Sequence, residues 1–140
     1  MECFDQEIKH DIKTILLDEI RRLKSTGHKI LLLSGSLPCL VEPLAQYVQA
    51  DFTICSEVER LNGRFTGELN APHPYALNKK TLAEQFCNKN SYDLKQSCAY
   101  GNDWSDRFLL KAVREAVAVD PDKKLRTMAL RNNWKIIEGN

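Results

Sequence analysis

The stretch Leu31-Leu32-Leu33-Ser34-Gly35-Ser36 decides the fold, because it is a short apolar run that ends abruptly in hydroxyl residues and a glycine. We predict that residues 29–33 form a buried strand. Pro38 stands where proline commonly opens a helix. Apolar residues then recur at helical spacing, at Leu40, Val41, Leu44 and Val48. A strand, a polar turn and a helix in this order predict the β-turn-α unit of an α/β protein.

A second apolar run ends in an acidic turn, Tyr100-Gly101-Asn102-Asp103-Trp104-Ser105-Asp106. We predict a strand over residues 96–100 and a helix over residues 105–115. The turn carries three oxygen-bearing side chains of the kind that Mg²⁺ prefers, Asn102, Asp103 and Asp106. Ser34 and Gly35 offer a hydroxyl and a backbone amide, the chemistry of a phosphate cradle. Together the two turns predict phosphoryl chemistry.

Further helices and strands follow from the same patterns. Before the first strand, apolar residues at three- and four-residue steps predict an amphipathic helix that Gly27 ends, with Ile8, Ile12, Ile15, Leu16, Ile20 and Leu23 on one face. Asn62-Gly63 is the signature of a tight hairpin between alternating residues. Other strands are predicted over 51–56, 116–119 and, at an edge, 134–137, and helices over 79–88 and after Pro121.

Strands that alternate with helices predict a parallel sheet with helices on both faces, the doubly wound class. In such sheets, ligands bind beyond the carboxyl ends of the strands. Ser34 and the stretch 102–106 both follow strands, so we expect the two turns to converge on one rim of the sheet.

Composition predicts a single soluble domain spanning residues 1–140, with 43% hydrophobic and 28% charged residues. Lys and Arg number 20 against 19 Asp and Glu, so neither nucleic acid nor a membrane surface is an expected partner. The five cysteines are scattered, which indicates reduced thiols and a cytoplasmic protein. His10, His28 and His73 lack a partner at metal-ligand spacing and are predicted to lie at the surface.

The order of these segments resembles the haloacid dehalogenase superfamily, in particular its phosphoserine-phosphatase-like subgroup, over roughly residues 12–137. Ser34 with Gly35 is similar to the family's second motif. Lys79 resembles the third, with Lys80 as the alternative if the helix begins one residue later. The stretch 100–106 resembles the fourth motif. The hairpin and the tail, residues 116–122 with Trp134, also fit the subgroup.

The resemblance implies a three-layer Rossmann-like core with a small protruding hairpin, and a Mg²⁺-dependent phosphomonoesterase that acts on a phosphorylated small molecule. It implies that Ser34, Gly35 and Lys79 bind phosphate. It also implies that Mg²⁺ binds at Asn102, Asp103 and Asp106. Asn102 stands where the family usually has a carboxylate, and its neutral amide oxygen is a weaker ligand for a hard cation.

One motif of the family has no counterpart before Ser34. The family begins with an apolar strand carrying Asp-x-Asp, whose first carboxylate attacks phosphorus, and then a helical cap that selects the substrate. Asp5 in Phe4-Asp5-Gln6-Glu7 is the only candidate for that carboxylate, but this segment also fits a charged helix start. We therefore expect an incomplete domain that is inactive alone.

Two functions and three ways of completing the sheet are open. The chain is either a phosphatase portion that works when a second polypeptide supplies the nucleophile, or a non-enzymatic module that binds a phosphorylated metabolite or a protein. The gap left by the missing central strand can be filled in three ways. Residues 29–33 can pair directly with residues 96–100, another polypeptide can add a strand, or a second copy of the chain can cover the exposed edges.

Overall fold

The computed structural model describes residues 14–139. Contacts within the chain group it into two compact units, Met1–Pro74 and Tyr75–Asn140. The organisation as one domain and the way in which the sheet is completed stay predictions. No helix between residues 14 and 139 combines the length and the apolar character that crossing a bilayer requires.

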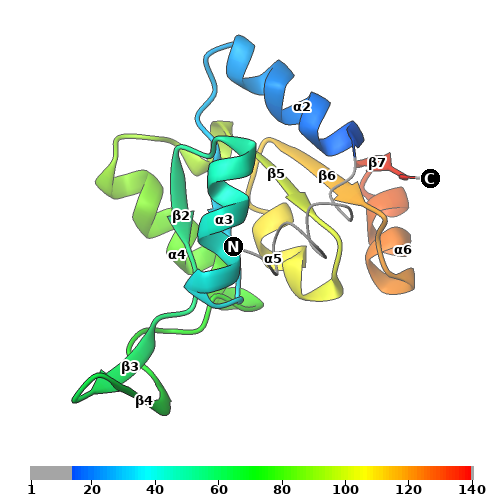
Figure 1. Ribbon diagram of the computed structural model, residues 1–140. Coiled ribbons are helices and arrows are strands. Elements are labelled where there is room, and N and C mark those ends of the chain that lie inside the picture. The colour runs from blue at the N-terminus through cyan, green and yellow to red at the C-terminus, as the bar shows by residue number, and fades with distance from the viewer. Residues whose placement is uncertain (1–13, 140) are drawn as a thin grey trace. The chain divides into compact units, whose positions relative to one another are not determined.

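The first unit contains the predicted succession of a strand, a polar turn and a helix (Figure 1). Its elements are α2 (Thr14–Ser25), β1 (Leu31–Leu33), α3 (Pro38–Val48), β2 (Phe52–Ile54), β3 (Val58–Leu61) and β4 (Arg64–Leu69). Strands β1 and β2 pair in parallel, with Leu32 opposite Thr53. Gly27, at a φ of 86°, follows the end of α2 as predicted. The predicted start of that helix at Ile8 lies outside the described residues.

Strands β3 and β4 form the predicted hairpin. Asn62 and Gly63 connect them, and both have a positive φ, 51° and 77°, as a two-residue turn of the primed type requires. Figure 1 shows the hairpin extending beyond the ends of β2 and α3. Leu61 and Phe65 on it are more than half exposed.

The second unit is a three-stranded parallel sheet in the order β5-β6-β7, with helices between its strands. Its elements are α4 (Leu77–Lys89), β5 (Cys98–Gly101), α5 (Arg107–Leu110), β6 (Glu115–Val119), α6 (Lys123–Arg131) and β7 (Lys135–Ile137), with 3₁₀ turns at Leu94–Gln96 and Trp104–Asp106. Parallel strands joined through helices confirm the predicted α/β class.

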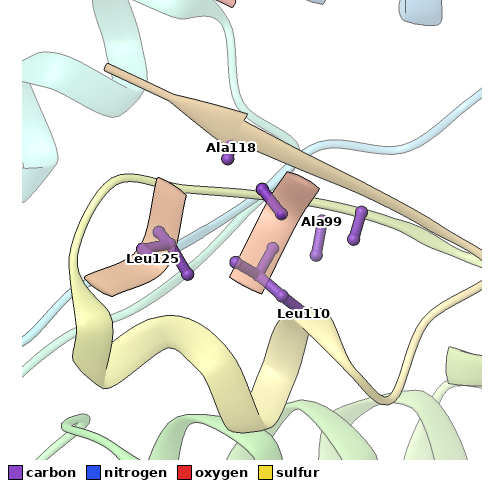
Figure 2. Packing of buried hydrophobic residues seen from close by; sticks show 6 residues of the cluster. Ala99, Leu110, Ala118 and Leu125 are labelled. Carbon is purple, nitrogen blue, oxygen red and sulfur yellow. The ribbon is translucent and has the colours of Figure 1, made fainter. Parts of the chain in front are cut away.

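The core of the second unit joins the sheet to two helices (Figure 2). Ala99 and Ala118 present small side chains on one face of β5 and β6, and Leu110 of α5 and Leu125 of α6 pack there, each almost fully buried. On the other face of β6, Val117 is also fully buried. A strand that is buried on both faces is typical of a parallel sheet. A strand packed in this way holds the polar turn at its end in place.

The helix predicted over residues 105–115 is correct in its first part but too long, because helical structure ends at Leu110. The chain forms a 3₁₀ turn at Trp104–Asp106, and α5 then covers only Arg107–Leu110. The N–H groups of Arg114 and Glu115 both donate to the carbonyl of Ser97, at 3.0 and 3.3 Å. Pairing with the segment before β5 therefore directs this stretch into β6 before another helical turn can form.

Candidate phosphate and metal sites

The Ser34 turn follows β1 and is held against the end of β2 by backbone hydrogen bonds. The N–H of Ser34 donates to the carbonyl of Ile54 at 2.9 Å, and the N–H of Ser56 donates to the carbonyl of Ser36 at 3.1 Å. Within the turn, the N–H of Ser36 donates to Oγ of Ser34 at 3.1 Å. Ser34 and Gly35 are half-buried. The turn is therefore a fixed polar loop between β1 and α3.

Two residues outside the predicted site support this turn. Ser56 is 2% exposed, its Oγ donates to the carbonyl of Gly35 at 2.6 Å, and the same Oγ lies 2.8 Å from Nδ1 of His73. The imidazole packs on Gly35 so closely that a Cβ there would lie 3.0 Å from Cε1 of His73. His73 is exposed as predicted, yet it also contacts the proposed phosphate turn.

The acidic turn of the second unit is built around Asp106, which is 5% exposed. Its Oδ1 accepts from Nζ of Lys79 at 2.7 Å. Its Oδ2 accepts from the backbone N–H groups of Asn102 and Asp103, at 3.1 and 3.2 Å. A Cβ on Gly101 would come within 2.8 Å of the Asp106 side chain, so glycine is required there. One buried carboxylate thus fixes the backbone of the turn and binds a lysine.

Lys79 and Lys80 have different partners, which spacing alone could not decide. Lys79 lies in the first turn of α4 with its side chain 19% exposed, and its ion pair with Asp106 is largely buried. Lys80 instead pairs with Glu84 at 3.4 Å on the exposed face of the same helix. The structure therefore brings Lys79, and not Lys80, to the acidic turn.

Asp103 caps the 3₁₀ turn that follows it. Its Oδ1 accepts from the N–H of Ser105 at 2.8 Å. Hydrogen bonds from the hydroxyl and the N–H of Ser105 hold the pKa of Asp103 below its ordinary value, while burial opposes this and the charge of Lys79 adds to it. The carboxylate is therefore ionised at neutral pH, as a metal ligand must be.

An Asp-x-Asp sequence, Asp120-Pro121-Asp122, follows β6, but both carboxylates bind backbone amides. Oδ1 of Asp122 accepts from the N–H of Leu125 at 2.9 Å, and its Oδ2 accepts from the N–H of Trp104. The N–H of Asp122 also donates to the carbonyl of Asn102 at 3.0 Å. Asp120 accepts from the N–H of Gly139 at 3.0 Å. Asp122 therefore ties the acidic turn to the start of α6, a role that the sequence analysis missed although aspartate before a helix signals a cap.

The acidic turn fits Mg²⁺ in chemistry but supplies only part of a coordination sphere. Carboxylate and amide oxygens are suitable ligands. Between residues 14 and 139, however, no group of three or more His, Cys, Asp or Glu side chains could hold a metal ion. Asp106 already binds Lys79 and two amides, which leaves Asn102 and Asp103 as the accessible oxygen donors of the turn.

The structure thus brings four predicted site residues together in the second unit: Lys79, Asn102, Asp103 and Asp106. Ser34 and Gly35 lie in the first unit, and their convergence with that group stays a prediction. Asp5 lies outside the described residues.

Comparison with known proteins identifies the family. The profile of the haloacid dehalogenase-like hydrolases matches residues 1–111. The chain belongs to the haloacid dehalogenase-like hydrolases. This confirms the resemblance on which the assignment of the motifs rests.

Relatives of this chain include phosphatases. A Streptomyces azureus protein named for inhibition of morphological differentiation is 30% identical over 94% of the chain and 50% of its own length. The phosphoserine phosphatase of Archaeoglobus fulgidus is 24% identical over 79% of the chain and 32% of its own length. A Bordetella pertussis protein of unknown function has a similar solved structure, with a TM-score of 0.89, 22% identity, and 97% of this chain and 62% of that one covered. The chain thus spans half or less of these two sequence relatives.

Proposed function

We propose that this haloacid dehalogenase-like chain is the phosphate- and magnesium-binding portion of a phosphomonoesterase that acts on a phosphorylated small molecule in the cytoplasm. The observation that carries the proposal is the largely buried ion pair between Lys79 and Asp106, at 2.7 Å. This pair fixes a lysine and an acidic turn together at the positions that match the family's third and fourth motifs. A lysine in this position suits a phosphoryl oxygen, because it is a compact cation.

Each residue of the proposed site has a separate role. The hydroxyl of Ser34, the amide of Gly35 and the ammonium of Lys79 bind the phosphoryl oxygens. Asn102 and Asp103 present oxygen ligands to Mg²⁺, and Asp106 holds their backbone and orients Lys79. When bound, Mg²⁺ would neutralise charge on the phosphoryl group.

The attacking carboxylate comes, in this proposal, from a second polypeptide. That carboxylate bonds to phosphorus while the ester oxygen leaves with a proton, and water then hydrolyses the aspartyl phosphate to free the carboxylate and inorganic phosphate. Electrostatic binding cannot replace this bond, since the covalent intermediate divides the reaction into two accessible steps. The chain alone is therefore expected to bind phosphate without turning over an ester.

The second candidate is a non-enzymatic module that binds a phosphorylated metabolite or a protein. It is favoured by the engagement of Asp106 and Asp122 with protein groups, which leaves the acidic turn with few oxygens for a metal. Such a module needs the phosphate-binding groups but neither the nucleophile nor Mg²⁺.

Activity and phosphate binding separate these functions. Purified protein is incubated with Mg²⁺ and a generic aryl phosphate, and we expect no hydrolysis above that of a matched Ser34→Ala variant. Clear hydrolysis would mean that the chain carries its own nucleophile. Binding of phosphate is measured by calorimetry, and we expect Ser34→Ala and Lys79→Ala to weaken it, with Lys80→Ala as the control.

A phosphoryl mimic separates the two candidates further. Beryllium fluoride mimics the phosphoryl group only when it bonds to a carboxylate, whereas phosphate needs only the cradle. Binding of phosphate but not of beryllium fluoride by the chain alone agrees with both candidates. Hydrolysis that appears when a peptide carrying an Asp-x-Asp strand is added would support the phosphatase portion. Unchanged phosphate affinity in both Ser34→Ala and Lys79→Ala would refute the site itself.

A further inference from the structure

We propose that His73 and Ser56 are positioning residues that make the hydroxyl of Ser34 a hydrogen-bond donor to a phosphoryl oxygen. The inference rests on the proposed phosphate site at Ser34 and extends it to two residues that lie 17 positions apart in the chain. All the groups involved belong to the first unit.

The direction of the first two hydrogen bonds follows from proton counting. Oγ of Ser56 lies 2.6 Å from the carbonyl oxygen of Gly35, and a carbonyl can only accept. A serine hydroxyl has one proton, so Ser56 gives it to Gly35. At the 2.8 Å contact with His73, Ser56 must then accept, and Nδ1 of His73 must carry a proton.

The next step runs through a peptide plane. The carbonyl of Gly35 and the N–H of Ser36 belong to the same planar trans peptide, so they point in opposite directions. Fixing the carbonyl with Ser56 therefore fixes the N–H of Ser36, which donates to Oγ of Ser34 at 3.1 Å. The position of the buried Ser56 hydroxyl therefore determines how the N–H of Ser36 contacts Ser34, the proposed phosphate ligand.

The polarity at Ser34 is what a phosphate site needs. Phosphoryl oxygens accept hydrogen bonds, so a serine that binds them must donate its proton. The N–H of Ser36 uses a lone pair of Oγ of Ser34, which directs the hydroxyl proton away from that amide. A donor bond to an anion is stronger than one between neutral groups, so a preset hydroxyl favours phosphate.

Packing keeps the histidine in place. A Cβ on Gly35 would lie 3.0 Å from Cε1 and 3.2 Å from Nε2 of His73, and 3.2 Å from the carbonyl oxygen of Pro74. Pro74 and Ser56 are among the most fully buried side chains of the described residues. Loss of the His73 ring would leave the buried Ser56 hydroxyl short of a partner, at a cost in free energy.

The test compares phosphate affinity, measured by calorimetry, across variants of the whole chain. We expect Ser56→Ala and His73→Ala to weaken phosphate binding about tenfold, the effect of losing one well-placed hydrogen bond. His73→Asn keeps an amide N–H near the place of Nδ1 and should recover most of the affinity. A merely structural histidine would give no such recovery.

The chain offers a matched control pair. Oγ1 of Thr26 lies 2.9 Å from Nδ1 of His28 and donates to the carbonyl of Leu23 at 2.9 Å. This pair repeats the chemistry of Ser56 and His73 in the loop after α2. Thr26→Val and His28→Ala should therefore leave phosphate affinity unchanged.

A second measurement decides the proton positions without phosphate. Nitrogen-15 NMR of the wild-type imidazoles should show a proton on Nδ1 of His73, and an Nδ1 without a proton would overturn the inference. Wild-type phosphate affinity in Ser56→Ala and His73→Ala would overturn it as well, as would equal losses in His73→Asn and His73→Ala. If the wild-type chain binds no phosphate, the proposed function fails, and a His73 with Nδ1 unprotonated would show independently that the hydrogen-bond chain is absent.

Discussion

The two polar turns of this protein are held in opposite ways. The Ser34 turn of the first unit is fixed by neutral groups, namely backbone amides and the Ser56 hydroxyl. The acidic turn of the second unit is fixed by charges, with the buried carboxylate of Asp106 between Lys79 and two amides, and Asp122 on the other side. Both follow strands of parallel sheets, so the difference lies in the side chains.

Whether a turn is held by neutral or by charged groups determines whether losing one of them affects mainly ligand binding or mainly stability. Neutral anchors hold the Ser34 turn without placing a negative charge beside a bound anion, and each contributes about 1 kcal/mol. Charged anchors keep carboxylates ionised and in place, but removing one partner leaves an uncompensated buried charge. We therefore expect the largest losses of stability in the second unit and losses mainly of affinity in the first.

The largest effect is expected from Lys79→Ala. It leaves the Asp106 carboxylate, which is 5% exposed, without its cation, and should lower the free energy of unfolding by about 3 kcal/mol in urea denaturation. Lys80→Ala, which removes an exposed pair on the same helix, should change it by less than about 0.5 kcal/mol.

A double variant checks the cause of that loss. Adding Asp106→Asn removes the unpaired charge, so Lys79→Ala should cost much less in that background than in the wild type. Equal costs of Lys79→Ala in both backgrounds would mean that the lysine stabilises the unit by packing alone.

The next largest effect is expected from Asp122→Ala. Asp122 caps α6 and accepts from the N–H of Trp104, so its loss should destabilise the protein by about 2 kcal/mol. Asp93→Ala is a suitable control, since Asp93 caps a short 3₁₀ turn through a single exposed bond. Hydrogen exchange at Trp104 should accelerate in Asp122→Ala, and an unchanged rate would argue against the tie between the turn and α6.

Local patterns predicted most of the fold because short-range physics decides it. The alternation around Asn62-Gly63 specified the hairpin, and the apolar run before Ser34 specified β1. The helix over residues 105–115 was predicted too long, because the N–H groups of Arg114 and Glu115 at its end donate to the carbonyl of Ser97, a contact that no local pattern contains. Such tertiary hydrogen bonds override moderate helix propensity.

The site residues that belong to a recognisable motif could be predicted from the sequence. The residues that support them from distant positions in the chain could not. Ser34 and the acidic turn carry recognisable chemistry in their own sequence. Ser56 and His73 reach the Ser34 turn only through the folded chain, and Asp122 reaches Trp104 across 18 positions. The spacing of these residues in the sequence does not predict such contacts.

A smaller effect, of opposite sign, is expected at the turn that leads into α4. Ala76 has a φ of 50° and a ψ of −125°, and the N–H of Asn78 donates to the carbonyl of Tyr75 at 3.0 Å, so Ala76 occupies a turn position that favours glycine. Ala76→Gly should stabilise the protein by about 1 kcal/mol. The same change at Ala83, inside α4 and buried, should destabilise it by at least about 1 kcal/mol. Destabilisation by both would mean that Ala76 is unstrained.

The smallest effect is expected from Asp103→Asn, and it depends on pH. The folded state lowers the pKa of Asp103, chiefly through hydrogen bonds from Ser105, so the ionised carboxylate contributes stability above its ordinary pKa. That contribution is lost as pH falls through the lowered, folded-state pKa. The stability difference between wild type and Asp103→Asn, measured by urea denaturation, should therefore shrink below about pH 4. Asp18→Asn, which removes an exposed carboxylate of α2, is the control, and a difference that persists at pH 2 would mean that Asp103 contributes through something other than its charge.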